Sequence, residues 1–262
     1  MSNSGLGELL TPMRLMFAIL ALFLPASSGF AANATVKDGA TLQLAGATYR
    51  LDGVDAPEFD QICLDDHADP WTCGVEARDQ LAKLIGARSL HCEDLGADKI
   101  IPRRHAALCT VDGETTSLNQ LLVRQGFALN AGPSARGSFK DDETAARNDR
   151  RGLWRGCFVA PQEFRHGKKD GTLLGAACRS DKDREIRQAL FPEEPATPPG
   201  CNIKAKFAVR ARVTGNLGIY HLQGCRSYAP LAKPDRWFCS EDDAQAAGFR
   251  RAYNCRAGTR RK

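Results

Sequence analysis

The ten cysteines of this chain are the feature that most constrains how it can fold. The segment Met13–Ala34 is typical of a secretory signal, with Arg14, an apolar run over Leu15–Pro25 and small residues around Ala31–Ala34. An apolar run of about eleven residues is too short to cross a membrane, so we expect residues 1–34 to be a signal peptide and no membrane span to follow. Export places the cysteines in an oxidising compartment, where their even number predicts up to five disulfides in a periplasmic or secreted protein.

Charge is distributed unevenly along the sequence. The chain has a formal net charge of +5, which divides into −4 over residues 35–165 and +9 over residues 166–262. A basic C-terminal part favours polyanionic partners such as nucleic acid, although basic surface also serves solubility alone. The hydrophobic content of 43% suffices for one core of ordinary size and a smaller unit.

Between residues 35 and 165 the patterns predict a small β-barrel with helices outside. Runs of β type lie over residues 41–44, 48–54, 90–93 and 106–111. Helical patterns cover residues 74–86, a segment opened by the capping box of Ser117 and Gln120, and an acidic-to-basic segment that begins near Asp141. The resulting order fits a five-stranded barrel of the oligonucleotide/oligosaccharide-binding (OB) fold with three helices.

The rest of the chain is predicted to hold an extension and a second unit. Residues 166–200 form the extension, and its part from Ile186 to Gly200 is interpreted as a stiff Pro-rich linker rather than an element. Residues 201–257 are expected to form a small Cys-rich α+β unit with a helix over Glu241–Ala247, and 258–262 a basic tail. A unit of about 55 residues needs disulfides or metal to be stable.

Several motifs between Thr35 and Arg165 carry a family resemblance. They are DGAT at residues 38–41, YRLDGVDAPE at 49–58, LVRQG at 122–126 and RGLW at 151–154. Together they resemble the thermonuclease (staphylococcal-nuclease-like) family. The resemblance implies calcium-assisted cleavage of nucleic-acid phosphodiesters, in which a cation and two arginines neutralise charge on the phosphoryl oxygens and a carboxylate activates water.

The resemblance assigns three residues to the phosphate site. Arg50 corresponds to the first phosphate arginine and Glu58 to the candidate base. The second arginine falls on Arg104, with Arg103 as its rival because the preceding turn, Ile100–Pro102, departs from the family pattern. Taken singly, each of these side chains would more often be a solvated surface group, and it is their combined spacing that favours phosphate contact.

The metal site implied by the resemblance is incomplete. Asp55 corresponds to a calcium carboxylate, with the Ala56 carbonyl beside it, but the other metal carboxylate of the family falls on Ala40. Calcium takes six to eight oxygens, so the loss of a charged one predicts weakened binding. Asp38 or Asp52 could substitute; Asp52 is slightly preferred because it lies two residues from Arg50 and so on the same strand face.

The departures from the family leave three functions open. The tyrosines that stack on the nucleotide correspond to Gly132 and Ser134, which removes a platform worth ~1–3 kcal/mol per base. The leading hypothesis is an exported endonuclease or phosphodiesterase acting on DNA or RNA. The alternatives are a non-catalytic nucleic-acid-binding module and an envelope protein whose barrel binds polysaccharide or a protein partner.

The positions of six cysteines suggest three pairs that support the site, although sequence alone cannot prove a pairing. One pair brackets the loop after Glu58, one lies on the two strands beside the turn with Arg103 and Arg104, and one is left before the linker. They are Cys63–Cys73, Cys92–Cys109 and Cys157–Cys178.

The C-terminal unit resembles, in degenerate form, the zinc module of the bacterial adaptive-response DNA-alkylation repair protein. The four ligand positions of that module read His221, Cys225, Ala252 and Cys255, so one ligand is missing. Structural zinc requires four ligands, so we expect no zinc at these positions. We therefore expect a Cys225–Cys255 disulfide in place of the metal, and Cys201–Cys239 as the other pair.

Overall fold

The structure is a computed structural model that describes residues 34–98, 100–135, 137–208 and 216–255. The predicted signal peptide, apart from Ala34, and the predicted basic tail lie outside the described residues. All described residues belong to one compact unit. Within these ranges, no helix has the length and apolar character that crossing a membrane requires.

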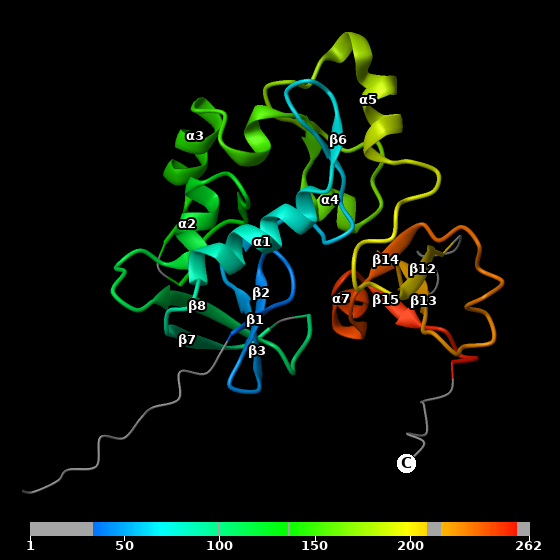
Figure 1. The fold of residues 1–262 in the computed structure, drawn as a ribbon, viewed down its shortest axis with the longest axis horizontal. Helices are drawn as coiled ribbons and strands as arrows, with labels where there is room; N and C mark the ends of the chain where they lie inside the picture. The colour runs from blue at the N-terminus through cyan, green and yellow to red at the C-terminus, as the bar shows by residue number, and fades with distance from the viewer. Residues whose placement is uncertain (1–33, 99, 136, 209–215, 256–262) are drawn as a thin grey trace, which may run out of the picture. The chain divides into compact units, whose positions relative to one another are not determined.

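A five-stranded sheet organises the N-terminal half of the described chain (Figure 1). Neighbouring strands pair antiparallel except β3 and β8, which run parallel. Four of the five strands lie on the β-type runs expected from the sequence, whereas β1 (Thr35–Val36) was not expected. A closed barrel is not shown, because no pairing between described residues joins the outer strands β1 and β7 (Leu90–Ala97). In order across the sheet the strands are β1 (Thr35–Val36), β2 (Thr41–Leu44), β3 (Ala47–Leu51), β8 (His105–Val111) and β7 (Leu90–Ala97).

Three helices accompany this sheet, as predicted. Helix α1 (Cys73–Ile85) contributes Leu81 and Ile85 to the same core as Leu42 and Leu51 of the sheet. Helix α2 (Leu118–Arg124) begins at the expected cap, where Gln120 N donates to Ser117 Oγ at 3.2 Å. Helix α3 (Lys140–Asn148) is acidic in its first turn and basic in its last, which suits the helix dipole.

Shorter elements complete this half of the chain. Two small antiparallel pairs are formed by β4 (Val54–Asp55) with β9 (Leu129–Asn130) and by β5 (Cys63–Leu64) with β6 (Pro70–Trp71). A third pair joins β10 (Phe158–Val159) to β11 (Leu173–Leu174). The remaining elements are the 3-10 helices η1 (Gly152–Arg155) and η2 (Ser180–Lys182) and helices α4 (Pro161–Arg165) and α5 (Asp183–Leu190).

Helix α5 corrects the interpretation of Ile186–Gly200 as a linker. The helix continues to Leu190, because Ile186 and Leu190 lie one turn apart and are both buried in a cluster with Leu64 and Val159. Residues 191–200 contain no helix or strand, so the linker interpretation holds only after the helix. The prolines were a correct signal for an irregular segment, but they begin at Pro192.

A four-stranded sheet forms the C-terminal module, by which we mean the described residues from Cys201 to Cys255. Its core contains Ala205, Tyr220, Phe238 and Phe249. The helix predicted over residues 241–247 is present as α7 (Glu241–Ala246), with Ser240 Oγ accepting from Asp243 N at its start. The strand order is β14 (Arg236–Phe238), β12 (Ile203–Phe207), β13 (Gly218–His221) and β15 (Phe249–Arg251).

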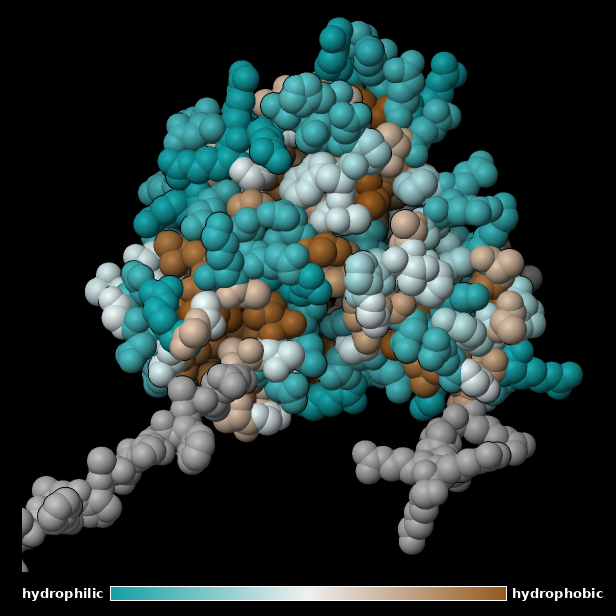
Figure 2. Space-filling view, viewed as in Figure 1, coloured by the Kyte–Doolittle hydropathy of each residue, from teal (hydrophilic) through white to brown (hydrophobic). Residues whose placement is uncertain are grey.

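The surface is largely polar. Figure 2 shows hydrophilic residues over most of one face, with apolar residues gathered in small separate areas. Among the described residues, the large hydrophobic side chains that stay exposed are Ile100, at 62%, and Tyr253, at 88%. Apolar residues of the two sheets are therefore mostly inside the two cores.

All ten cysteines are joined in disulfides. The pairs are those expected from the sequence, and Cys92 and Cys109 are directly opposite in the β7–β8 register. Because the bonds close loops of the chain, they restrict the unfolded state and add to stability. The five pairs are Cys63–Cys73, Cys92–Cys109, Cys157–Cys178, Cys201–Cys239 and Cys225–Cys255.

Replacing Cys63 and Cys73 together by alanine should lower the free energy of unfolding by about 2–3 kcal/mol, because the unfolded chain gains conformational freedom when this loop opens. Urea unfolding of the oxidised variant and of the oxidised parent chain measures the change. An unchanged midpoint with an unchanged slope would show that this disulfide contributes nothing to stability.

Candidate active site

Arg50, Glu58 and Arg104, the three residues predicted for the phosphate site, line one pocket. Strands β3 and β8 bring the two arginines together, since the strands are parallel neighbours and Arg50 is paired with Ala106, two residues after Arg104. The cavity volume is about 60 Å³. Pockets that enclose a whole small ligand usually measure about 300–1,000 Å³, so this one accepts a small group such as a phosphate rather than a nucleotide.

Arg104, and not its rival Arg103, lines the pocket. Arg104 is 4% exposed and donates from Nη2 to Asp98 Oδ2 at 3.1 Å. Its buried Nε has no hydrogen-bond partner among the described residues. Arg103 is exposed and forms an ion pair with Asp242 of helix α7. This Nε is itself enclosed, so an anionic ligand could use it as a donor only after the pocket rearranges.

The backbone of Glu58 is fixed by two neighbours. Gln61 is fully buried, and its Oε1 accepts from Glu58 N at 3.2 Å while Gln61 N donates to Glu58 O at 2.8 Å. Gly74, in the first turn of α1, approaches so closely that a Cβ there would lie 1.8 Å from Glu58 O. Glycine is thus required at position 74, and the contact holds Glu58 at the pocket.

The Glu58 carboxylate is held by two guanidinium groups. Arg165 Nε, at the end of α4, donates to Glu58 Oε1 at 2.6 Å, and Arg236 Nη2, from β14, donates to Oε2 at 3.5 Å. Burial alone would raise the pKa of Glu58, but the charges of Arg165, Arg236 and Arg50 lower it below the ordinary value of 4.5. Glu58 is therefore ionised at neutral pH.

Asp55, the predicted calcium ligand, already has donors on both oxygens. Arg165 Nη2 donates to Oδ1 at 2.7 Å, and Gln162 N donates to Oδ2 at 2.9 Å. One guanidinium therefore joins Asp55 to Glu58. Ala56 lies beside them and lines the pocket.

These residues do not fit a calcium ion in their present arrangement. Calcium requires six to eight oxygen ligands. Ala40 lines the pocket without a side-chain oxygen, and the Arg165 guanidinium holds one oxygen each of Asp55 and Glu58. A cation bound between those two carboxylates would have to displace Arg165.

Of the two substitute ligands, the structure places Asp38 at the pocket and Asp52 elsewhere, so the preference for Asp52 is wrong. Asp38 lines the pocket and accepts from Ala40 N at 2.7 Å. Asp52 Oδ2 instead accepts from Ala135 N at 3.0 Å. The reason is that β3 ends at Leu51 and the chain turns at Gly53, whose φ is +73°, so the alternation of a strand no longer applies.

Sequence reasoning missed the ion pair between Asp60 and Arg236. Arg236 donates from Nε and Nη2 to the two Asp60 oxygens, each at 2.7 Å, and both side chains are at most 3% exposed. Its guanidinium also lies 4.6 Å from the ring of Phe164 and 4.9 Å from that of Phe238. The three acidic residues within positions 55–60 were a signal that cations were needed, but no local pattern named Arg165 or Arg236.

A second missed residue, Asp243 of helix α7, also lines the pocket. Its Oδ2 accepts from Ser240 Oγ at 2.5 Å. Burial, followed by the charge of Asp38 and that of Glu58, raises the pKa of Asp243 to about 7. The C-terminal module thus supplies a carboxyl group and part of the wall of the pocket, the latter with Trp237, Phe238, Cys239 and Ala246.

The remaining sequence candidates lie away from this pocket. Gly132 and Ser134 belong to the loop between β9 and α3 and do not line the pocket. In the zinc-like positions, His221 Nδ1 is 2.6 Å from Ser227 Oγ. The sulfurs of Cys225 and Cys255 are bonded to each other, so neither is a thiolate ligand.

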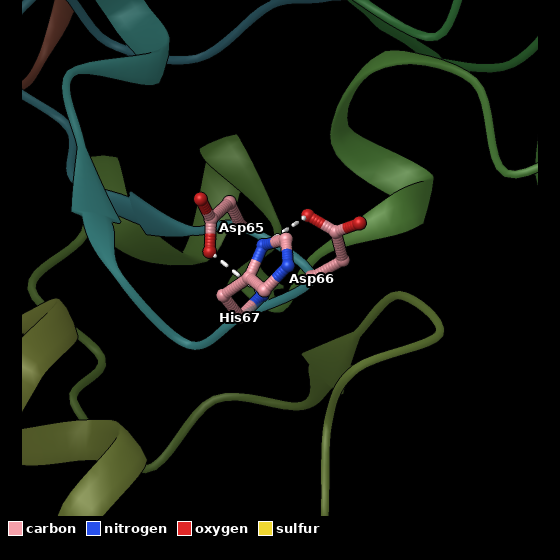
Figure 3. Close-up of side chains that lie close together, drawn as sticks. All are labelled: Asp65, Asp66 and His67. Atoms are coloured by element: carbon pink, nitrogen blue, oxygen red, sulfur yellow. Dashed lines mark hydrogen bonds and ion pairs between the residues drawn. The ribbon is translucent and has the colours of Figure 1, made fainter.

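A separate acidic cluster consists of Asp65, Asp66 and His67 in the turn between β5 and β6 (Figure 3). One ligand atom from each lies within 4.8 Å of the others. Asp65 Oδ1 accepts from the backbone N of His67 at 2.8 Å and from that of Asp69 at 2.9 Å. These bonds account for the turn itself, and the cluster lies outside the pocket lining.

Two comparisons with known proteins show what this chain is similar to. The model of the family described as staphylococcal nuclease homologue matches residues 48–156. The succinoglycan biosynthesis protein ExoI of Rhizobium meliloti (strain 1021) is 32% identical over 149 residues, which cover 54% of this chain and 76% of that protein. The family match includes Arg50, Glu58 and Arg104 and ends before Arg165 and Arg236.

The lowered pKa of Glu58 predicts a specific loss of stability in acid. A carboxylate whose pKa is lower in the folded state contributes stability above its unfolded pKa and loses it as the pH falls through the folded value. Glu58→Gln should therefore lower the free energy of unfolding by about 1–3 kcal/mol at neutral pH and have a smaller effect near pH 3.

Urea unfolding across this pH range measures the difference. Glu114→Gln is the matched control, since Glu114 forms an exposed ion pair with Arg88. A deficit of Glu58→Gln that stays constant with pH would contradict the ionised, paired state of Glu58.

Proposed function

This chain belongs to the family of staphylococcal nuclease homologues, and on that premise we propose that it is an exported phosphodiesterase that cleaves DNA or RNA at the pocket of Arg50, Glu58 and Arg104. The observation that carries the proposal is the convergence of these three side chains on one pocket. Two guanidinium groups and a carboxylate are what a phosphodiester and its attacking water require. Export is supported by the signal-like segment and the five disulfides.

Each residue has a distinct task in this proposal. Arg50 and Arg104 bind the phosphoryl oxygens and offset the charge that grows on them. Glu58 accepts a hydrogen bond from the attacking water and orients it. Its lowered pKa makes it a weak proton acceptor, so we expect turnover to be slow.

Calcium is the cofactor that the family resemblance implies, and it would supply Lewis-acid stabilisation of the phosphoryl oxygens. Asp55, the Ala56 carbonyl and Asp38 are the residues the resemblance and the pocket offer for it. Because they do not fit the ion while Arg165 is in place, no step of this proposal depends on calcium.

A second candidate function is binding of nucleic acid without cleavage. The specific observation in its favour is that Arg165 and Arg236 both hold Glu58. These contacts restrict the Glu58 carboxylate, which would have to orient the attacking water in a hydrolase. This function predicts affinity that falls steeply with salt, since it would rest on phosphate contacts by arginine.

A polysaccharide ligand is the third candidate. The relative ExoI is named as a succinoglycan biosynthesis protein. The OB-fold family also hosts sugars, so an envelope polysaccharide, or a protein partner, is an alternative ligand of this chain.

The proposed activity is tested by incubating the purified, oxidised chain with fluorescent single-stranded DNA and RNA oligonucleotides, with calcium or with a chelator. We expect cleavage that falls by ~10²-fold in Arg50→Gln and in Glu58→Gln, because each removes a group that acts on the transition state. Arg88→Gln is the control, since Arg88 is exposed and pairs with Glu114.

The alternatives give different results in the same assays. Salt-dependent binding of the oligonucleotide with no product would replace the hydrolase by the binding module. Absence of both cleavage and affinity at low salt would favour the polysaccharide or protein partner.

A further inference from the structure

Asp55, which the resemblance assigns to a metal, and Glu58, which it assigns to the base, are already joined by a positive charge of the protein itself. We propose that Arg165, held between Asp55 and Glu58, is a built-in cation that replaces the divalent metal, so that this pocket binds its anionic ligand without calcium. The absence of calcium binding rests on the geometry alone, whereas the statement that the pocket acts on a phosphodiester rests on the proposed function.

The contacts of Arg165 are those of a bridging cation. Its Nε lies 2.6 Å from Glu58 Oε1 and its Nη2 lies 2.7 Å from Asp55 Oδ1. The three side chains are between 12% and 17% exposed, so water screens these charges little. Charge-assisted hydrogen bonds of this kind are about twice as strong as neutral ones, and a metal would have to break both.

The backbone around Arg165 keeps it in this position. Helix α4 begins with Pro161, which suits the first helical position, and Gln162 N donates to the second oxygen of Asp55. Phe164 is buried and stacks on Phe191, with ring centroids 5.6 Å apart. The helix is thus tied to Asp55 at its first turn and packed next to Arg165 at its last.

Arg236 completes the charge balance from the C-terminal module. It pairs with Asp60 and contacts Glu58 Oε2 at 3.5 Å, so that two guanidinium groups face the three carboxylates of residues 55–60. The two guanidinium groups offset two of the three carboxylate charges, which leaves one negative charge. A calcium site needs more than this, since such sites concentrate several charged oxygens on one ion.

Ala40 fits the same interpretation. Position 40, where the resemblance implies a metal carboxylate, is an alanine, and a guanidinium lies between the carboxylates of Asp55 and Glu58. If the missing oxygen were the only defect, Ala40→Asp would restore calcium binding. If Arg165 replaces the metal, restoration needs Arg165 to be removed as well.

Thermal unfolding of the full oxidised chain, followed in a series of calcium chloride concentrations with magnesium chloride as a parallel series, tests the proposal. The set of proteins is the parent chain, Ala40→Asp, Arg165→Gln, the double variant and the control Arg179→Gln, whose arginine is exposed and pairs with Asp181. A ligand that binds only the folded state raises Tm in a saturable way.

We expect no calcium-specific rise in Tm for the parent chain, for Ala40→Asp or for Arg179→Gln. We expect a saturable rise of several degrees for the double variant and a smaller one for Arg165→Gln. A saturable rise in the parent chain or in Ala40→Asp would overturn the proposal, and so would a double variant that folds and does not respond. If neither Arg165 variant folds, the parent chain and Ala40→Asp decide the outcome.

Failure of this proposal is distinguishable from failure of the proposed function. Oligonucleotide cleavage by the parent chain that continues in a chelator supports both. Cleavage that requires calcium overturns the built-in cation and leaves the phosphodiesterase intact. A flat calcium titration without any cleavage supports the built-in cation and removes the phosphodiesterase.

Discussion

Three carboxylates within residues 55–60 create the electrostatic constraint on which the rest of the site depends. Asp55 and Asp60 are buried and Glu58 is nearly so, and buried carboxylates are costly unless they are paired. The chain supplies Arg165, 107 residues after Glu58, and Arg236, 176 residues after Asp60. Pairing these charges connects the strand β4 segment to helix α4 and to the C-terminal module.

The C-terminal module is consequently part of the pocket rather than a separate appendage. Arg236 of β14 enters the carboxylate group, while Trp237 and Asp243 line the cavity. Arg103, which sequence reasoning weighed as a phosphate ligand, instead pairs with Asp242 at the start of helix α7. Because these residues of the C-terminal module form one wall, the pocket is narrow. A small anionic group can enter it whole, whereas a larger ligand could insert only one such group.

A guanidinium and a metal ion differ as sources of positive charge. Calcium is exchangeable and polarises a bound oxygen directly, whereas arginine is permanent, planar and donates hydrogen bonds in a fixed geometry. In this pocket Arg165 stabilises the ionised state of Glu58, which lowers its pKa and restrains its carboxylate. The contact of Arg165 with Glu58 thus neutralises the carboxylate and also makes Glu58 a weaker base. Only a change of Arg165 could separate these two effects.

Features that depend on local pattern could be predicted before the fold was known. The capped start of α2 at Ser117 and the stripe of α1 follow from a short motif and from periodicity. Arg50 and Glu58 were named by the family resemblance, and both line one pocket. The three disulfide pairs expected from cysteine position and the two expected with the C-terminal resemblance are those found. Local pattern gave the wrong expectation at two places. Strand β3 ends before Asp52, so Asp52 does not share a strand face with Arg50. Helix α5 continues to Leu190 because its apolar residues are buried in a core.

The pairing of the charges could not be predicted from local pattern and is seen only in the folded chain. Whether Arg103 or Arg104 reaches the pocket, and which cations meet Asp55, Glu58 and Asp60, depends on segments more than 100 residues apart in sequence. Coulombic pairing acts through space and leaves no periodic trace along the chain. A short motif can therefore predict the carboxylates of a site. The arginines that neutralise those carboxylates can be identified only from the folded chain.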